Sequence, residues 1–102
     1  MFMHLPLIVR RKEVVDLLDS AAVRCEAGND VVSSIQLASG IEPSMVSDDF
    51  YSSLSLLHGE KRLVFGICWD YLEAVAGDDL VDMDIKDPAG WVRRCARLAE
   101  WA

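Results

Sequence analysis

Basic residues and glycine are scarce in this sequence, and each shortage argues against a class of function. Ten lysines and arginines stand against seventeen aspartates and glutamates, for a formal net charge of −7. A chain with this balance repels nucleic acid and anionic membrane surfaces at long range, so it favours basic partners or simple solubility. The six glycines occur singly, and no glycine-rich loop is present to cradle a phosphate.

Cysteine and histidine are also rare. The three cysteines form no CxxC pair, and the two histidines, His4 and His58, are far apart, which argues against a zinc finger or a secreted disulfide framework. We expect Cys25, Cys68 and Cys95 to be buried thiols, since each falls on the apolar face of a predicted helix. His58 lies near several serines, but no G-x-S-x-G motif is present. We therefore expect no enzymatic activity and no cofactor.

The N-terminal segment MFMHLPLIVRRKE lacks the features of a secretory signal. Its positive charges follow the apolar run instead of preceding it, and it contains no small-residue cleavage site. The run is also too short to span a membrane. We expect a cytoplasmic protein whose residues 1–10 form an apolar, extended arm, because Pro6 disfavours a helix there.

The spacing of apolar residues predicts an all-α fold, a small bundle of four to five helices that forms one domain over residues 1–102. The clearest helix covers residues 11–27 and ends before Gly28, a residue that tolerates the left-handed backbone of a helix end. Its apolar stripe recurs at steps of three and four and consists of Val14, Leu17, Leu18, Ala21, Ala22 and Cys25.

The middle of the chain is less regular. Residues 30–39 are ambiguous but suit a short helix that Asp30 can cap, and Ser44 or Ser47 can start the next helix. Residues 35–50, IQLASGIEPSMVSDDF, also resemble a helix-turn-helix unit. Their spacing is too short, however, and the would-be recognition helix is acidic without any lysine or arginine. Because reading a duplex requires phosphate neutralisation, we expect no direct binding of nucleic acid.

The segment 60–76, EKRLVFGICWDYLEAVA, predicts a helix that is apolar over more than half its circumference. Its polar strip is narrow and consists of Gly66, Asp70 and Glu73. A helix this apolar is either central in its own domain or shared with a second chain, and sharing is favoured, so we expect a homodimer. The predicted interface for a partner or a second copy combines residues of this helix with one tryptophan of the last helix: Leu63, Phe65, Ile67, Trp69, Leu72 and Trp101.

The stretch GDDLVDMDIKDP, residues 77–88, is dense in aspartate and invites a metal-binding interpretation. Calcium loops of the EF-hand type need oxygen ligands at fixed positions and a glycine at the sixth, and neither possible register of this stretch supplies them. We therefore predict no metal site but an acidic connector over residues 77–87, with an extended segment at 80–85. The last helix then starts at Asp87-Pro88, an N-cap followed by a first-position proline. The predicted acidic patch consists of Asp78, Asp79, Asp82 and Asp84.

Protein–protein binding is the function that these features favour. Three tryptophans in a short chain, an apolar surplus on one helix and clustered acidic residues are typical of an interface whose charge selects its partner. We expect a protein that inhibits or sequesters another protein, with an anti-activator that masks a transcriptional regulator as the preferred form. An immunity protein against a basic toxin and a secretion chaperone remain alternatives. From another class, a divalent-metal-binding or catalytic domain could use the aspartates of residues 78–87.

Overall fold

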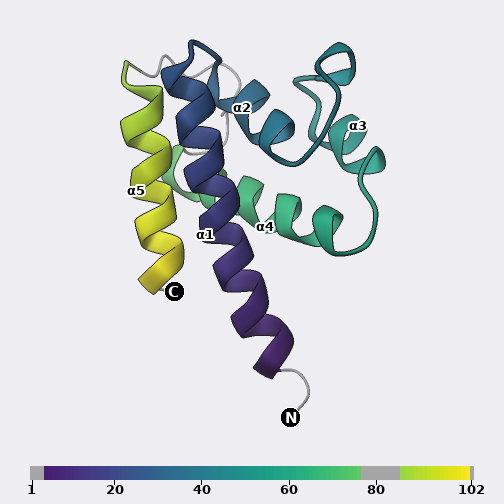
Figure 1. Cartoon of the computed structure of the whole chain (residues 1–102), viewed down its shortest axis with the longest axis vertical. Helices are drawn as coiled ribbons and strands as arrows, with labels where there is room; N and C mark the ends of the chain where they lie inside the picture. Colours follow the sequence, from purple (N-terminus) through teal and green to yellow (C-terminus); the bar gives the residue numbers. More distant parts are fainter. Residues whose placement is uncertain (1–3, 77–85, 102) are drawn as a thin grey trace.

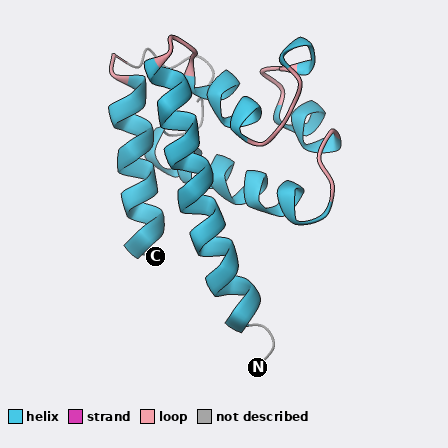
Figure 2. Cartoon of the chain, in the orientation of Figure 1, coloured by secondary structure: helices cyan, strands magenta, loops and turns pink. Residues whose placement is uncertain are grey.

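Helices are the regular elements in the part of the chain that the structure describes. The computed structural model describes residues 4–76 and 86–101. Its elements, all of them helical in that part (Figure 2), are α1 (His4–Glu26), α2 (Val31–Ala38), a 3-10 turn (Pro43–Met45), α3 (Phe50–Ser55), α4 (Gly59–Ala76) and α5 (Pro88–Trp101). The predicted all-α bundle of four to five helices is therefore confirmed.

Helices α1 and α5 lie side by side and run in opposite directions (Figure 1). Helix α2 packs against α1, and α4 crosses the bundle so that it contacts α1, α2, α3 and α5. Helix α4 therefore contacts each of the other α-helices that the structure describes. In residues 4–76 and 86–101, no helix is long and apolar enough to cross a membrane.

Helix α1 follows its predicted stripe but begins earlier than expected. Val14, Leu18 and Ala21 of the stripe are at most 2% exposed, and the helix ends at a left-handed Gly28 with φ +107°. The prediction of an extended arm is wrong for residues 4–10, which belong to α1, while residues 1–3 lie outside the described residues. Pro6 lies in the first turn, where the backbone N–H that proline lacks would have no partner within the helix.

Helix α2 is capped as predicted, since the Asp30 carboxylate accepts a hydrogen bond from the Ser33 backbone N–H at 2.7 Å. Neither Ser44 nor Ser47 starts the next helix. Helix α3 begins at Phe50 and is capped by Asp49. Ser47 is held in the loop because its backbone N–H donates to the Gln36 side-chain oxygen at 2.9 Å.

The same region rules out a helix-turn-helix arrangement. Between the end of α2 at Ala38 and the start of α3 at Phe50, the chain forms only loops and the 3-10 turn Pro43–Met45. No helix occupies the position of a recognition helix, so the sequence likeness to that unit is not matched by structure.

Helix α5 starts where predicted, at Pro88, and the Asp87 side chain accepts a hydrogen bond from the Gly90 N–H at 3.2 Å. Its Arg93 pairs with Glu26 of α1 at 2.8 Å, which ties the two antiparallel helices together. Leu98 on this helix is 50% exposed. The acidic patch at 78, 79, 82 and 84, and the expected extended segment at 80–85, lie outside the described residues.

One core joins α1, α2, α4 and α5. It contains the three predicted buried thiols, Cys25, Cys68 and Cys95, which are free and at most 8% exposed. The largest side chains that are fully buried in it are Phe65, Leu18, Ile35, Leu72, Gln36, Val14 and Val92.

Candidate functional site

The structure divides the six predicted interface residues into two groups. Phe65, Trp69 and Leu72 are at most 4% exposed and belong to the core of the single chain, so they are removed from any docking surface of this fold. Leu63 is 40% exposed, Ile67 is half-buried and Trp101 is 86% exposed. Only these last three reach the surface.

Helix α3 is the reason that one apolar flank of α4 is buried. The Phe50 ring stacks on Phe65 with centroids 6.0 Å apart and packs against Trp69 at 5.1 Å. Phe65 and Trp69 also contact each other, at 5.7 Å. This aromatic cluster covers the flank of α4 that carries Phe65 and Trp69. It leaves the other predicted flank, with the exposed Leu63 and the half-buried Ile67, uncovered by α3.

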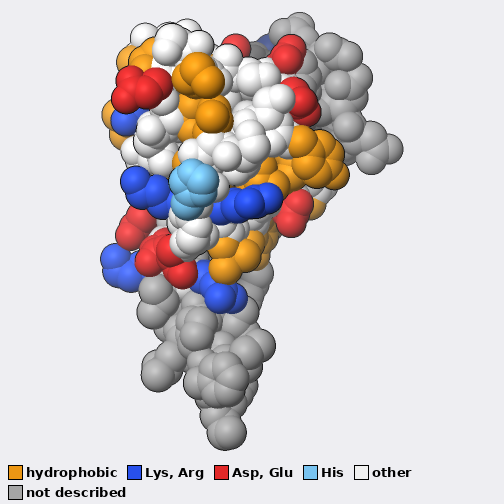
Figure 3. All heavy atoms as spheres, turned by 90° about the vertical axis from the view of Figure 1, so that its right-hand side faces the viewer, with side chains coloured by type: hydrophobic (Ala, Val, Ile, Leu, Met, Phe, Trp, Pro, Cys, Tyr) orange, Lys and Arg blue, Asp and Glu red, His pale blue; other side chains and the backbone are white. Residues whose placement is uncertain are grey.

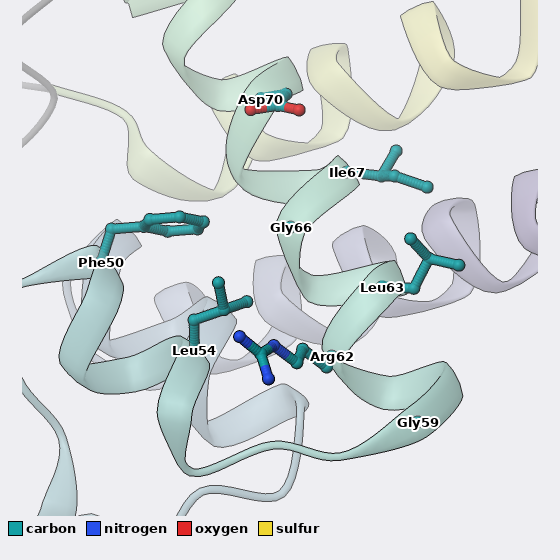
Figure 4. A pocket seen from close by; sticks show the side chains of 8 residues that line it. All are labelled: Phe50, Leu54, Gly59, Arg62, Leu63, Gly66, Ile67 and Asp70. Carbon is teal, nitrogen blue, oxygen red and sulfur yellow. The ribbon is translucent and has the colours of Figure 1, made fainter.

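An open groove lies between α3 and the uncovered flank of α4, with a volume of about 530 Å³. Its apolar residues lie on both sides of the α4 backbone at Gly66: Phe50 and Leu54 of α3 on one side, and Leu63 and Ile67, which point away from α3, on the other (Figure 4). Glycine leaves the floor of the groove without a side chain. The lining residues are Phe50, Leu54, Gly59, Arg62, Leu63, Gly66, Ile67 and Asp70. We refer to this feature as the α3–α4 groove.

The ends of the groove carry opposite charges. Arg62 lies toward one end and Asp70 toward the other (Figure 4), and both are exposed. Within the described part of the chain, neither side chain forms an ion pair or a hydrogen bond. The groove therefore presents an apolar centre with one free cation and one free anion, a pattern that suits the apolar core and polar rim of a protein interface.

Sequence reasoning found only part of this groove. Leu63 and Ile67 were predicted as interface residues and Gly66 and Asp70 as part of a polar strip, whereas Phe50 and Leu54 were not predicted as interface residues. A signal was nevertheless present, because Arg62 precedes Gly66 by four residues and Asp70 follows it by four. Such spacing places both charges on the face of the glycine.

Two further hollows on the surface are more polar. One of about 380 Å³ includes Glu13, Asp16, Glu60 and Lys61, and another of about 470 Å³ includes Asp30 and Asp48. Among the residues that the structure describes, no three histidine, cysteine or acidic side chains gather in a way that could hold a metal ion. Figure 3 shows the face of the molecule with α3 and the start of α4, where hydrophobic, basic and acidic side chains lie next to one another.

The serine hydroxyls of α3 and the buried thiols are engaged in local structure. The hydroxyls of Ser52 and Ser55 are bound to Asp49 and to the Ser52 carbonyl, both within α3 and its cap. Burial raises the pKa of Cys68 to about 12 and that of Cys95 to about 11, so both thiols stay protonated and unreactive at neutral pH.

Trp101, at the end of α5, is not part of the α3–α4 groove lining. It is the most exposed of the large hydrophobic side chains that the structure describes. The groove is therefore the best-formed candidate site in the described part of the chain. Comparison with protein families, with curated proteins and with solved structures finds no match to this chain.

Proposed function

We propose that this chain is a non-catalytic protein that binds another protein through the α3–α4 groove and thereby inhibits or sequesters it. The groove itself carries the proposal: apolar walls that remain open to solvent, with Arg62 and Asp70 unpaired at its ends. Exposed apolar surface of this kind is stabilised when another chain covers it. A groove between two helices suits an amphipathic helix, which inserts apolar side chains at steps of three and four.

The preferred form of this function is an anti-activator that masks the dimerisation or ligand-binding domain of a transcriptional regulator. A net charge of −7 disfavours competition with the regulator for DNA, so inhibition would act on the regulator's own protein surface. A toxin or a secreted protein as the client would instead identify an immunity protein or a secretion chaperone. All of these clients would bind in the same groove, so the identity of the client distinguishes the three functions.

The test is site-specific photo-crosslinking in the native cell. A photoreactive amino acid replaces Leu63 in the groove, and the matched control carries it at Val23, an apolar position on α1 that is 58% exposed. We expect a second protein to be crosslinked from Leu63 and not from Val23. With the purified client, Leu63→Asp should weaken binding at least roughly tenfold, because it places a charge among apolar contacts.

The outcome decides between clear alternatives. A transcriptional regulator whose own dimerisation is blocked by the purified chain supports the anti-activator. If position 63 crosslinks only to other copies of this chain, or crosslinks the same proteins as position 23, the proposed function is wrong.

A further inference from the structure

Gly66 lies in the middle of α4, where glycine weakens a helix relative to alanine. Packing within the chain does not account for it, since a Cβ atom at this position would meet nothing within 4 Å. Glycine in such a position is useful when another backbone approaches closely. The described part of this chain provides no such neighbour, so the approaching backbone would have to come from outside it.

The charges around Gly66 have the symmetry of a two-fold axis. Arg62 and Asp70 are each four residues from Gly66, and they are separated by about 12 Å along the helix axis, too far to pair with each other. If a second α4 lies antiparallel across the first with Gly66 at the crossing, Arg62 of each copy meets Asp70 of the other. The groove is thus complementary in charge to itself.

The apolar walls have the same symmetry. Figure 4 shows Phe50 and Leu54 on one side of Gly66, and Leu63 and Ile67 on the other. Two antiparallel helices that pack face to face are related by a two-fold axis that lies in the interface and is perpendicular to both, so each wall meets the same wall of the other copy. In this orientation Leu63 lies near Ile67 of the second copy, and Phe50 lies near Leu54 of the second copy. A second copy in this orientation would cover the exposed Leu63 and the half-buried Ile67 of the first.

We propose that a second copy of this chain occupies the α3–α4 groove, with the two α4 helices antiparallel and Gly66 at their crossing on the two-fold axis. Such an interface is isologous, because each copy contributes the same surface, and antiparallel helices also place their dipoles favourably. The inference deepens the proposed function and rests on it in treating this groove as the docking surface. Since the groove is shared, a client helix would have to displace the second copy.

Charge reversal with mixing tests this register. Arg62→Asp gives a copy with two acidic groove ends, and Asp70→Arg gives a copy with two basic ends. Each variant alone would juxtapose like charges twice, so we expect its dimer dissociation constant to rise roughly tenfold or more. An equimolar mixture of the two variants restores both opposite-charge pairs. We therefore expect the heterodimer to form with a dissociation constant close to that of the wild-type dimer. Sedimentation velocity would follow the change between the 11.4 kDa monomer and a species of twice that mass.

The controls separate the interface from the fold. Arg94→Asp and Asp48→Arg reverse exposed charges that are not in the groove lining, and both should dimerise like wild type. Gly66→Leu should prevent dimerisation while helical circular dichroism is retained, since the space around Gly66 is open within the chain.

Three results would overturn the proposal: a wild-type chain that stays monomeric at its highest soluble concentration, single charge variants that dimerise as wild type does, or a mixture that does not form the heterodimer. Failure here and failure of the proposed function are distinguishable. A dimer with this register but no crosslinked client leaves the inference intact and removes the function. If a client is crosslinked and the chain is strictly monomeric, the proposed function stands and the inference of a dimer is wrong.

Discussion

Gln36 provides the sharpest test of how the loop before the groove is held. Its side chain is fully buried, and both of its polar atoms are bonded. The amide nitrogen donates to the carbonyls of Val32 and Ser47, and the oxygen accepts from the Ser47 N–H at 2.9 Å and from the Ser53 hydroxyl at 2.8 Å. One side chain thus connects α2, the loop and α3. The two donors and two acceptor sites of a glutamine amide are all used.

The perturbation is Gln36→Met, which keeps a similar shape and removes every hydrogen bond. The Ser53 hydroxyl retains the Asp49 carbonyl as acceptor at 3.1 Å, so the main cost falls on the Ser47 N–H and carbonyl. Each buried group left without a partner costs about 1–3 kcal/mol, and Ser47 is half-buried, which favours the lower part of that range. We expect the free energy of unfolding to fall by about 2–4 kcal/mol, a large share of the total stability of a small domain.

Urea unfolding followed by tryptophan fluorescence measures this loss, and hydrogen exchange at the Ser47 amide locates it. Ser53→Ala is the matched control, because it removes one hydrogen bond to Gln36 and leaves Ser47 held, so it should cost only about 1 kcal/mol. A Gln36→Met variant within about 0.5 kcal/mol of wild type, or one whose Ser47 amide keeps its protection, would refute the view that this side chain holds the loop.

Three further predictions concern the rest of the bundle. Since burial raises the pKa values of Cys68 and Cys95 to about 12 and about 11, an aromatic disulfide reagent at pH 8 should label them only on unfolding; rapid labelling of the native protein would contradict their burial. The hydrogen bond from Arg93 lowers the pKa of Glu26, so the stabilisation is present above the ordinary value of 4.5 and is lost as pH falls through the lowered value. Arg93→Gln should therefore flatten the fall in thermal stability below that pH, and an unchanged slope would count against the pair. Asp87→Ala removes the N-cap of α5 and should cost about 1 kcal/mol in urea unfolding, with Asp87→Asn close to wild type.

Local signals were sufficient for α1 and α5. The stripe of α1 and the glycine that ends it, and the cap and proline that start α5, are short-range features whose physical effect depends little on the rest of the chain. They predicted the buried thiol of each helix as well. The start of α1 was missed because Pro6 was treated as a helix breaker, although the first turn tolerates proline.

The loop between α2 and α3 could not be predicted in the same way. Ser47 is a good capping residue by type, but its backbone is bound to Gln36, eleven positions earlier. A long-range hydrogen bond therefore overrides the local preference of Ser47 to cap a helix. The helix begins instead at Phe50, which brings the Phe50 ring onto Phe65 and Trp69.

Helix α4 shows why the candidate site was only half predicted. The periodicity of the sequence shows how wide the apolar arc of α4 is. It does not show which part of that arc is buried within the chain, because this depends on where α3 packs. Because Phe50 covers the Trp69 flank, the predicted surface residues Phe65 and Trp69 became core, and Leu63 and Ile67 remained outside. The residues that distinguish the remaining face are then the polar ones, since an arginine and an aspartate placed evenly about a glycine serve no evident purpose within the described chain. In the proposed dimer, a second α4 that runs in the opposite direction would supply each of these charges with a partner of the opposite sign.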